Sequence, residues 1–251
     1  MPFTFAHPAI VIPCKKKAPK YLDLSALVIG SMAPDFEYFL RFMPKGTIGH
    51  TLLGSIWFDI PLVIILYLLW EYIIKRPFIL SMPQPIDKTL YHITHRKIKN
   101  STIKKRIIFI YSALIGIYSH ILWDSFTHKT GFFVMKLSLL SNKIGILNYK
   151  VPIYKFLQHG STIIGSIYII VYLYSLMKYT DCNMRFFNKE DKINYWILVI
   201  VITFSIFLYR ITMTLDFVSL KYFGIYIVSF ISSILLSILI VSFVFKIKYR
   251  N

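Results

Sequence analysis

The chain has 251 residues, a formal net charge of +18 at pH 7 and 56% hydrophobic residues. Its mean hydropathy of +0.61 lies well above that of soluble globular domains, so the composition excludes an ordinary soluble protein and indicates a membrane protein. The lysines and arginines are spread between the apolar runs and form no basic helix with interleaved aromatics. This pattern argues against nucleic acid as a partner and favours the lipid bilayer with its anionic phospholipids.

The N-terminal segment begins with the apolar stretch Met1–Pro13. Its positive charges follow the apolar residues instead of preceding them, which is the reverse of a secretory signal peptide. We therefore expect this stretch to be retained, together with His7. Thr4 is placed to cap a short helix that contains His7.

A carboxylate follows a short apolar helix that the pattern predicts over Leu22–Met32. Pro34 disfavours the helical conformation at Ala33, so Asp35 is expected at a break or at the start of a helix. A carboxylate at such a position can turn into a site. His50 follows, near the first turn of the first long apolar run.

Five apolar runs dominate the chain after residue 55. They are long and apolar enough to cross a hydrocarbon core of roughly 30 Å, and they comprise Ile56–Ile74, Ile107–Phe126, Ser161–Met177, Tyr195–Met213 and Phe223–Phe245. They predict an all-α, polytopic membrane protein with about five transmembrane helices and short N-terminal helices. We expect one integral-membrane domain over residues 1–251, with a metal-site segment in 1–55 and the transmembrane helices and loops in 56–251.

The second apolar run carries the most informative polar groups. If this run is helical, His120 and Asp124 lie at i and i+4 on one face, with His128 one turn further along the same stripe. Such groups inside an apolar helix must pair with each other, with a metal or with a water-filled cavity, because an isolated charge there costs several kcal/mol. A hydrogen-bonded pair of His120 and Asp124 that ties helices together is the simpler alternative.

Alternating membrane crossings bring the candidate groups to one side of the membrane. Three precede the first run, two lie near the exit of the second, and two lie between the second and third runs, the last at the end of the predicted loop Lys129–Gly160: His7, Asp35, His50, His120, Asp124, His128 and His159. The opposite face carries more lysines and arginines. The positive-inside rule therefore places the site on the extracytoplasmic face, which we expect to be that of a bacterial inner membrane.

Five of these groups form the predicted metal site: His7, Asp35, His50, His120 and Asp124. Imidazoles and carboxylates without sulfur suit zinc first, and also manganese or iron. The set suffices for one four-coordinate ion with an outer carboxylate, or for a tighter two-ion centre. Taken singly, His7 and His50 also fit helix-end histidines with backbone partners.

Several motifs together resemble an uncharacterised bacterial integral-membrane family, domain of unknown function 4184. The resemblance covers essentially the whole chain and is carried by Met1–Ala9, Gly30–Phe39, His50–Gly54, His120–Gly131 and Gln158–Ser161. That family in turn resembles, more distantly, membrane-bound metal-dependent hydrolases and the helical zinc-dependent phospholipase C group. The remote resemblance implies a His/Asp metal centre with His120 and Asp124 as ligands from one helix and His7, Asp35 and His50 completing it.

The chain departs from the phospholipase C group at two points. No other histidine is followed four residues later by an acidic residue, and the chain starts with Met1 and Pro2 in place of tryptophan. A three-zinc centre is therefore not expected here.

The leading functional hypothesis is a metal-dependent hydrolase that acts on a phosphoester or a lipid at the membrane surface. A bound divalent ion would lower the pKa of a water molecule toward 7. Asp35 or Asp124 would accept the proton. His128 or His159 would stabilise the developing charge or protonate the leaving group.

Two other classes of function stay open. The same His/Asp cluster fits a non-enzymatic membrane protein in which a metal is structural or sensed, and it fits a transporter with a His/Asp relay. A closed four-ligand shell would favour the structural ion, and a pocket open to the lipid-water boundary would favour the enzyme. Polar groups continuing through the last three spans would favour transport.

Overall fold

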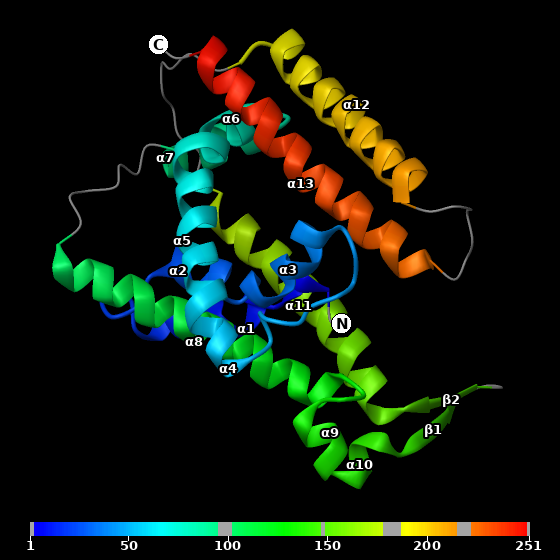
Figure 1. Cartoon of the computed structure of the whole chain (residues 1–251). Helices are drawn as coiled ribbons and strands as arrows, with labels where there is room; N and C mark the ends of the chain where they lie inside the picture. The colour runs from blue at the N-terminus through cyan, green and yellow to red at the C-terminus, as the bar shows by residue number, and fades with distance from the viewer. Residues whose placement is uncertain (1–2, 95–101, 147–148, 178–186, 215–221, 250–251) are drawn as a thin grey trace. The chain divides into compact units, whose positions relative to one another are not determined.

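A computed structural model gives the structure of the protein and describes residues 3–94, 102–146, 149–177, 187–214 and 222–249 (Figure 1). These residues are almost entirely helical, with one two-stranded antiparallel sheet. The elements in chain order are η1 (Thr4–Ala6), α1 (Pro8–Lys17), α2 (Leu24–Gly30), α3 (Ala33–Arg41), α4 (Leu52–Gly54), η2 (Ser55–Asp59), α5 (Ile60–Leu69), η3 (Trp70–Ile74), α6 (Lys75–Leu80), α7 (Ile86–Thr94), α8 (Ile103–Thr127), α9 (Phe132–Lys136), α10 (Ser138–Ser141), β1 (Lys143–Ile146), β2 (Tyr149–Pro152), α11 (Ile153–Leu176), α12 (Lys189–Thr214) and α13 (Phe223–Lys248).

Five helical stretches in the described part of the chain are long and apolar enough to cross a membrane. They are Leu52–Leu80, Ile103–Lys136, Ile153–Leu176, Lys189–Met213 and Phe223–Lys248. Each overlaps one of the predicted apolar runs, which confirms the all-α, polytopic fold class. The first stretch is continuous through α4, η2, α5, η3 and α6, where η2 and η3 are π-helical turns.

The segment predicted as a loop over Lys129–Gly160 is more structured than the sequence suggested. It contains α9, α10 and the hairpin of β1 and β2, whose register pairs Lys143 with Pro152 and Gly145 with Lys150. α11 then begins at Ile153, well before the apolar run becomes continuous. The hairpin strands are only four residues long, so their alternation is too short to stand out in the sequence.

The described residues fall into two compact units. One lies within 1–35, 47–64 and 100–174, and the other within 36–46, 65–99 and 175–251. All seven candidate site residues belong to the first unit. The helices of that unit therefore decide the geometry of the site.

In the first unit, α2 and α8 approach each other closely. A Cβ added at Gly30 would lie 2.5 Å from the carbonyl oxygen of Ala113, and one added at Gly116 would lie 2.5 Å from the carbonyl oxygen of Leu27. Small residues allow backbones to approach in this way inside membranes. The contact fixes the C-terminal end of α2, directly before Ser31.

The N-terminal end of α2 is held against α8 as well. The Asp23 carboxylate caps α2 by accepting from the N–H of Ala26 at 2.9 Å, and the N–H of Asp23 donates to the Ser112 hydroxyl on α8 at 2.9 Å. An N-cap of this kind stabilises a helix by about 1 kcal/mol. Both ends of α2 are thus positioned relative to α8.

In the second unit, buried hydroxyls join α12 to α13. Tyr195 and Ser242 lie 2.8 Å apart, and Thr203 and Ser237 lie 2.6 Å apart. Hydrogen bonds of this kind between membrane helices contribute about 0.6 kcal/mol each. The polar groups of these helices therefore have a packing role, and the core around them is apolar, with Val199, Val241 and Phe245.

The close approach of α2 and α8 makes Gly116 sensitive to substitution. Gly116→Val should lower the melting temperature of the detergent-purified protein by several degrees, because overpacking of this kind costs about 1–3 kcal/mol. Gly160→Val in α11 is the matched control, since a Cβ there would meet nothing within 4 Å. Thermal unfolding followed by tryptophan fluorescence measures both variants, and equal melting temperatures would contradict the close contact.

Candidate metal centre

His120 and Asp124 lie one turn apart on α8, and both are buried. The Nε2 atom of His120 is 3.4 Å from Oδ2 of Asp124. On its other side, Nδ1 of His120 lies 2.7 Å from the carbonyl oxygen of Ser31. Because a carbonyl can only accept, Nδ1 carries a proton, and Nε2 is the ring nitrogen that faces the carboxylates.

Asp35 lies in the first turn of α3 and is completely buried. The Thr4 hydroxyl donates to Oδ2 of Asp35 at 2.6 Å. The other oxygen, Oδ1, lies 3.5 Å from Nε2 of His50 and 3.5 Å from Nε2 of His120. Carboxylates that ligate metals are themselves hydrogen-bonded, and the bond from Thr4 to Oδ2 leaves Oδ1 as the oxygen available to an ion.

His50 lies in the segment before α4 and completes the group. Its Nε2 atom is 3.6 Å from Oδ2 of Asp124. The side chain is 27% exposed, whereas those of Asp35 and His120 are completely buried. His50 therefore marks the side on which the cluster meets its surroundings.

The spacing of these four residues fits a metal ion. One donor atom from each of Asp35, His50, His120 and Asp124 lies within 4.8 Å of the other three. Each nitrogen is 3.4–3.6 Å from each carboxylate oxygen, which is longer than the roughly 2.7–3.2 Å of an N–H···O hydrogen bond. Bonds of about 2.0–2.2 Å to a tetrahedral zinc would separate neighbouring ligands by roughly 3.3–3.6 Å. The cluster can bind a metal ion.

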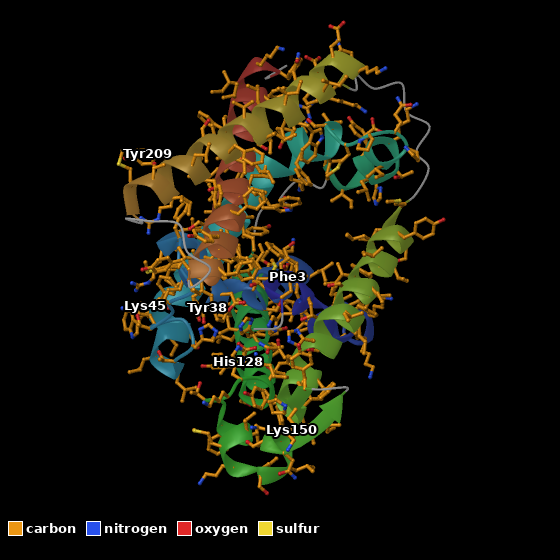
Figure 2. The ribbon with its side chains drawn as sticks, turned by 90° about the vertical axis from the view of Figure 1, so that its right-hand side faces the viewer. Phe3, Tyr38, Lys45, His128, Lys150 and Tyr209 are labelled. Atoms are coloured by element: carbon orange, nitrogen blue, oxygen red, sulfur yellow. The ribbon has the colours of Figure 1, made fainter. Side chains whose placement is uncertain are left out.

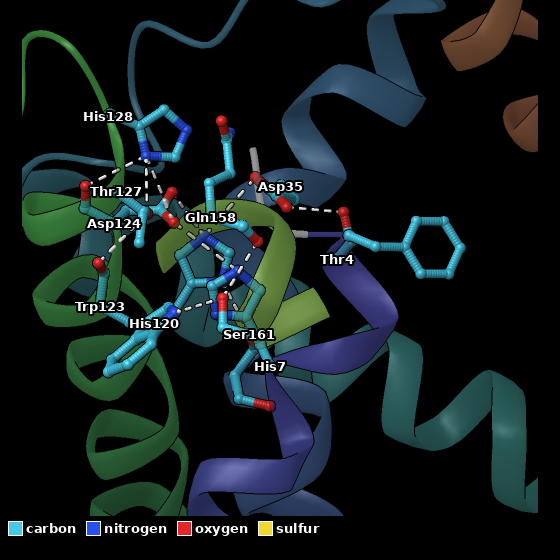
Figure 3. A network of polar contacts seen from close by, with 12 residues as sticks. Thr4, His7, Asp35, His120, Trp123, Asp124, Thr127, His128, Gln158 and Ser161 are labelled. Carbon is cyan, nitrogen blue, oxygen red and sulfur yellow. Dashed lines mark hydrogen bonds and ion pairs between the residues drawn. The ribbon is translucent and has the colours of Figure 1, made fainter. Parts of the chain in front are cut away.

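Two further imidazoles face the other oxygen of Asp124. Nε2 of His7 lies 3.7 Å and Nδ1 of His128 lies 3.5 Å from Oδ1. The His7 ring is stacked on that of His120, with centroids 3.8 Å apart and 18° between the planes. His7 is buried, and neither of its ring nitrogens has a hydrogen-bond partner among the described residues. The structure thus places His7 beside the four-residue group (Figure 3).

His128 does not lie on the helical stripe that the sequence predicted. α8 ends at Thr127, and His128 has an extended backbone with φ −110° and ψ 143°. Its side chain still reaches the cluster, because Nδ1 lies 3.1 Å from the carbonyl oxygen of Asp124 one turn back. Figure 2 shows His128 at the end of α8.

With this geometry in place, a comparison with protein-family models found one described as Domain of unknown function (DUF4184), which matches residues 1–243. The chain belongs to this family. Searches of curated proteins and of solved structures found no match. The role of the centre in this DUF4184 protein therefore has to be argued from its own residues.

Burial and neighbouring charges shift the pKa values of His50 and Asp35, which lie outside the membrane spans, in opposite directions. Burial lowers the pKa of His7 to about 3, so this imidazole is neutral. Burial would also lower the pKa of His50, but Asp124 and Asp35 outweigh it and raise that pKa to about 9. Burial would raise the pKa of Asp35, but His120 and His50 hold it below its usual range. Two buried carboxylates thus demand positive charge at this point.

His159 lies apart from the centre. It is an exposed residue of α11, and the polar contacts of the cluster among the described residues do not include it (Figure 3). The residue before it, Gln158, is the buried one and accepts a hydrogen bond from Lys155 at 2.8 Å. Of the two histidines considered for proton transfer, only His128 is next to the aspartates.

The sequence missed the groups that orient the candidate ligands. Thr4 was expected to cap a helix, but η1 has no side-chain cap and the hydroxyl donates to Asp35 instead. The carbonyl of Ser31 orients His120, and a backbone carbonyl leaves no signal in a sequence. For Thr4 the only available signal was its position three residues before His7.

The four-residue group predicts a specific loss of metal on substitution. His120→Ala and Asp124→Asn should each abolish near-stoichiometric metal binding, because each removes one of four donors from a buried set. Elemental mass spectrometry of detergent-purified protein after zinc resupply measures the content. His159→Ala is the control and should keep the wild-type content. Equal metal in all variants would rule out this centre.

Thr4 offers a separate test of how Asp35 is oriented. Thr4→Val removes the donor but keeps the shape, and it should weaken zinc binding by about 10–100-fold, the usual cost of losing an outer hydrogen bond to a ligand. Thr4→Ser retains the hydroxyl and should restore most of the affinity. Competition with a chromogenic chelator gives the affinities, and indistinguishable values for valine and serine would contradict the role of the hydroxyl.

Proposed function

We propose that this protein is a membrane-bound, metal-dependent hydrolase that acts on the phosphoester of a lipid at the membrane surface. One observation carries the proposal: four donors at ligand spacing, three of them on buried side chains, with two more imidazoles on the remaining oxygen of Asp124. A purely structural zinc site needs four ligands and no additional polar groups. The surplus groups at one edge of the cluster are what a reaction requires.

Asp35, His50, His120 and Asp124 would hold the ion, with zinc the best match to two nitrogen and two oxygen donors. When bound, the ion would supply Lewis acidity and, on taking a fifth ligand beyond these four donors, an acidified water molecule. His50 is half-buried, so the approach of water is assigned to its side of the cluster. Thr4 and the Ser31 carbonyl hold their ligands in place without touching substrate.

Asp124 is the better proton acceptor of the two aspartates. Oδ2 of Asp35 accepts from Thr4, and its Oδ1 is the oxygen that would hold the ion beside His50 and His120. Asp124 keeps Oδ1 on the side away from His120, and this oxygen has no hydrogen-bond partner among the described residues. An oxygen so placed can take a proton from water during attack on the ester.

His128 is assigned to the leaving group. It is partly exposed and lies 3.5 Å from Oδ1 of Asp124. The proton that Oδ1 takes from water would pass to His128 and from His128 to the leaving group. His159 is not given a part in the reaction, because it lies outside the cluster.

The membrane setting supports the choice of substrate. Five candidate spans and a net charge of +18 suit a protein held among anionic phospholipids. We assign the protein to a bacterial inner membrane with the site on the extracytoplasmic face, on the basis of the lysine and arginine distribution.

A structural or sensing metal site is the second candidate. It is favoured by the same four donors, because they alone can saturate a tetrahedral zinc. Replacing zinc with cobalt distinguishes a hydrolytic centre from a structural one. The visible absorption of cobalt changes when a soluble phosphate monoester is added to an open centre, and it stays unchanged at a closed four-ligand centre.

The hydrolase proposal predicts zinc-dependent turnover. Zinc-loaded wild type should hydrolyse phosphatidylglycerol in mixed vesicles or the soluble diester bis(p-nitrophenyl) phosphate, and chelation should abolish this activity reversibly. His128→Gln should keep its zinc but lose about 10²–10⁴ in kcat, the usual worth of a positioned proton donor. Product release measured by phosphorus NMR or absorbance gives the rates.

His159→Gln is the matched control for this experiment and should retain wild-type turnover. Zinc-loaded protein that hydrolyses neither substrate, with a cobalt spectrum that no phosphate perturbs, would overturn the hydrolase proposal in favour of the structural ion.

A further inference from the structure

We propose that an apolar cavity between α1 and α11 binds one acyl chain of a membrane phospholipid and thereby holds the headgroup ester at the metal centre, an inference that rests on the proposed hydrolase function. The cavity lies wholly within the first unit. Its volume of about 620 Å³ falls within the range of roughly 300–1,000 Å³ for ligand sites.

One face of α11 forms a long wall of this cavity. The lining residues recur every three or four positions from Ile153 to Tyr168, which is one stripe of an α-helix. Sixteen residues of helix extend about 24 Å. Half of the hydrocarbon core of a bilayer is about 15 Å, so the wall is long enough for the acyl chain of one leaflet.

The opposite wall comes from the N-terminal segment and connects the cavity to the metal centre. His7 lines the cavity, and the same ring stacks on His120 and approaches Asp124. Trp123 and Ser161 also line the cavity. Their polar groups are paired with each other, because the indole N–H of Trp123 donates to the Ser161 hydroxyl at 3.2 Å. The wall therefore presents a polar group toward the cluster and is otherwise apolar.

Small residues create the space. Gly165 allows α11 to approach the N-terminal segment, since a Cβ there would lie 2.9 Å from the carbonyl oxygen of Ala6. The N–H of Phe3 also donates to the Thr162 hydroxyl on α11 at 3.1 Å. Beside this fixed contact, a Cβ at Gly160 would meet nothing within 4 Å. The cavity is thus a gap between two anchored walls.

A lipid chain is the occupant that the surroundings supply. α11 is one of the five candidate membrane spans, and its side chains Ile163 and Ile167 are well exposed, as on a surface that meets lipid. A soluble polar ligand would find few polar partners in this cavity. An acyl chain already lies within reach in the bilayer, and its burial needs no polar contact.

Photo-crosslinking of a lipid in nanodiscs tests the proposal. The probe is phosphatidylglycerol with a diazirine in the middle of one acyl chain, and peptide mass spectrometry locates the adducts. We expect adducts on Ile10 or Pro13 and on Phe156 or Leu157, which line the cavity. Adducts confined to the outer face of α11, at Ile163 or Ile167, would overturn the proposal.

Gly160→Phe fills the cavity without a backbone clash. It should reduce the cavity adducts about tenfold, because the acyl chain would lose the burial of roughly two methylene groups and bind correspondingly more weakly. Zinc content should stay unchanged. Gly145→Phe on β1 is the matched control, because a Cβ there also meets nothing within 4 Å. Equal labelling of both variants would overturn the proposal.

Asp124→Asn separates this inference from the hydrolase proposal. The variant should keep cavity labelling while it loses metal and turnover. Cavity labelling in a wild-type protein that hydrolyses no phosphoester would leave the chain-binding site standing and remove the hydrolase function. Turnover of bis(p-nitrophenyl) phosphate without any cavity labelling would support the hydrolase function and overturn the acyl-chain site.

Discussion

The first unit of this protein has to compensate two carboxylates that are buried next to each other. Asp35 is completely enclosed and Asp124 nearly so, and each buried charge costs several kcal/mol unless it is compensated. The chain surrounds them with imidazoles at 3.4–3.7 Å. Contacts of this length are too long to satisfy the carboxylates by hydrogen bonding alone. A divalent cation bound among them would offset the electrostatic penalty and would also fit the donor spacing.

The positions of the candidate ligands depend on close backbone packing between α2 and α8. Gly30 and Gly116 let α2 lie directly against α8, and this places the Ser31 carbonyl where it can accept from His120. The N-terminal segment in turn brings Thr4 to Asp35. The candidate ligands therefore depend on contacts between segments far apart in the sequence, and small residues at those contacts matter as much as the ligands themselves.

The sequence could predict what local spacing determines. Five long apolar runs were enough for the fold class, and the i, i+4 spacing of His120 and Asp124 placed both on one helical face because a helix fixes that relation. It could not predict where α8 ends, so His128 was expected on the helix and is found beyond it. Thr4 was missed, and His159 was grouped with the site, because both depend on how distant segments pack.

His7 lies at both the metal centre and the apolar cavity. As a fifth candidate ligand it is in surplus, since four donors already suffice for zinc. As a core histidine it has no hydrogen-bond partner among the described residues, whereas a buried imidazole normally has one. Its position in the wall of the apolar cavity, with its ring against His120, gives a reason for both features. A neutral ring placed between metal and cavity can accept a hydrogen bond from a substrate whose chain lies in the cavity, and an unpartnered nitrogen is then the part of the site that substrate completes.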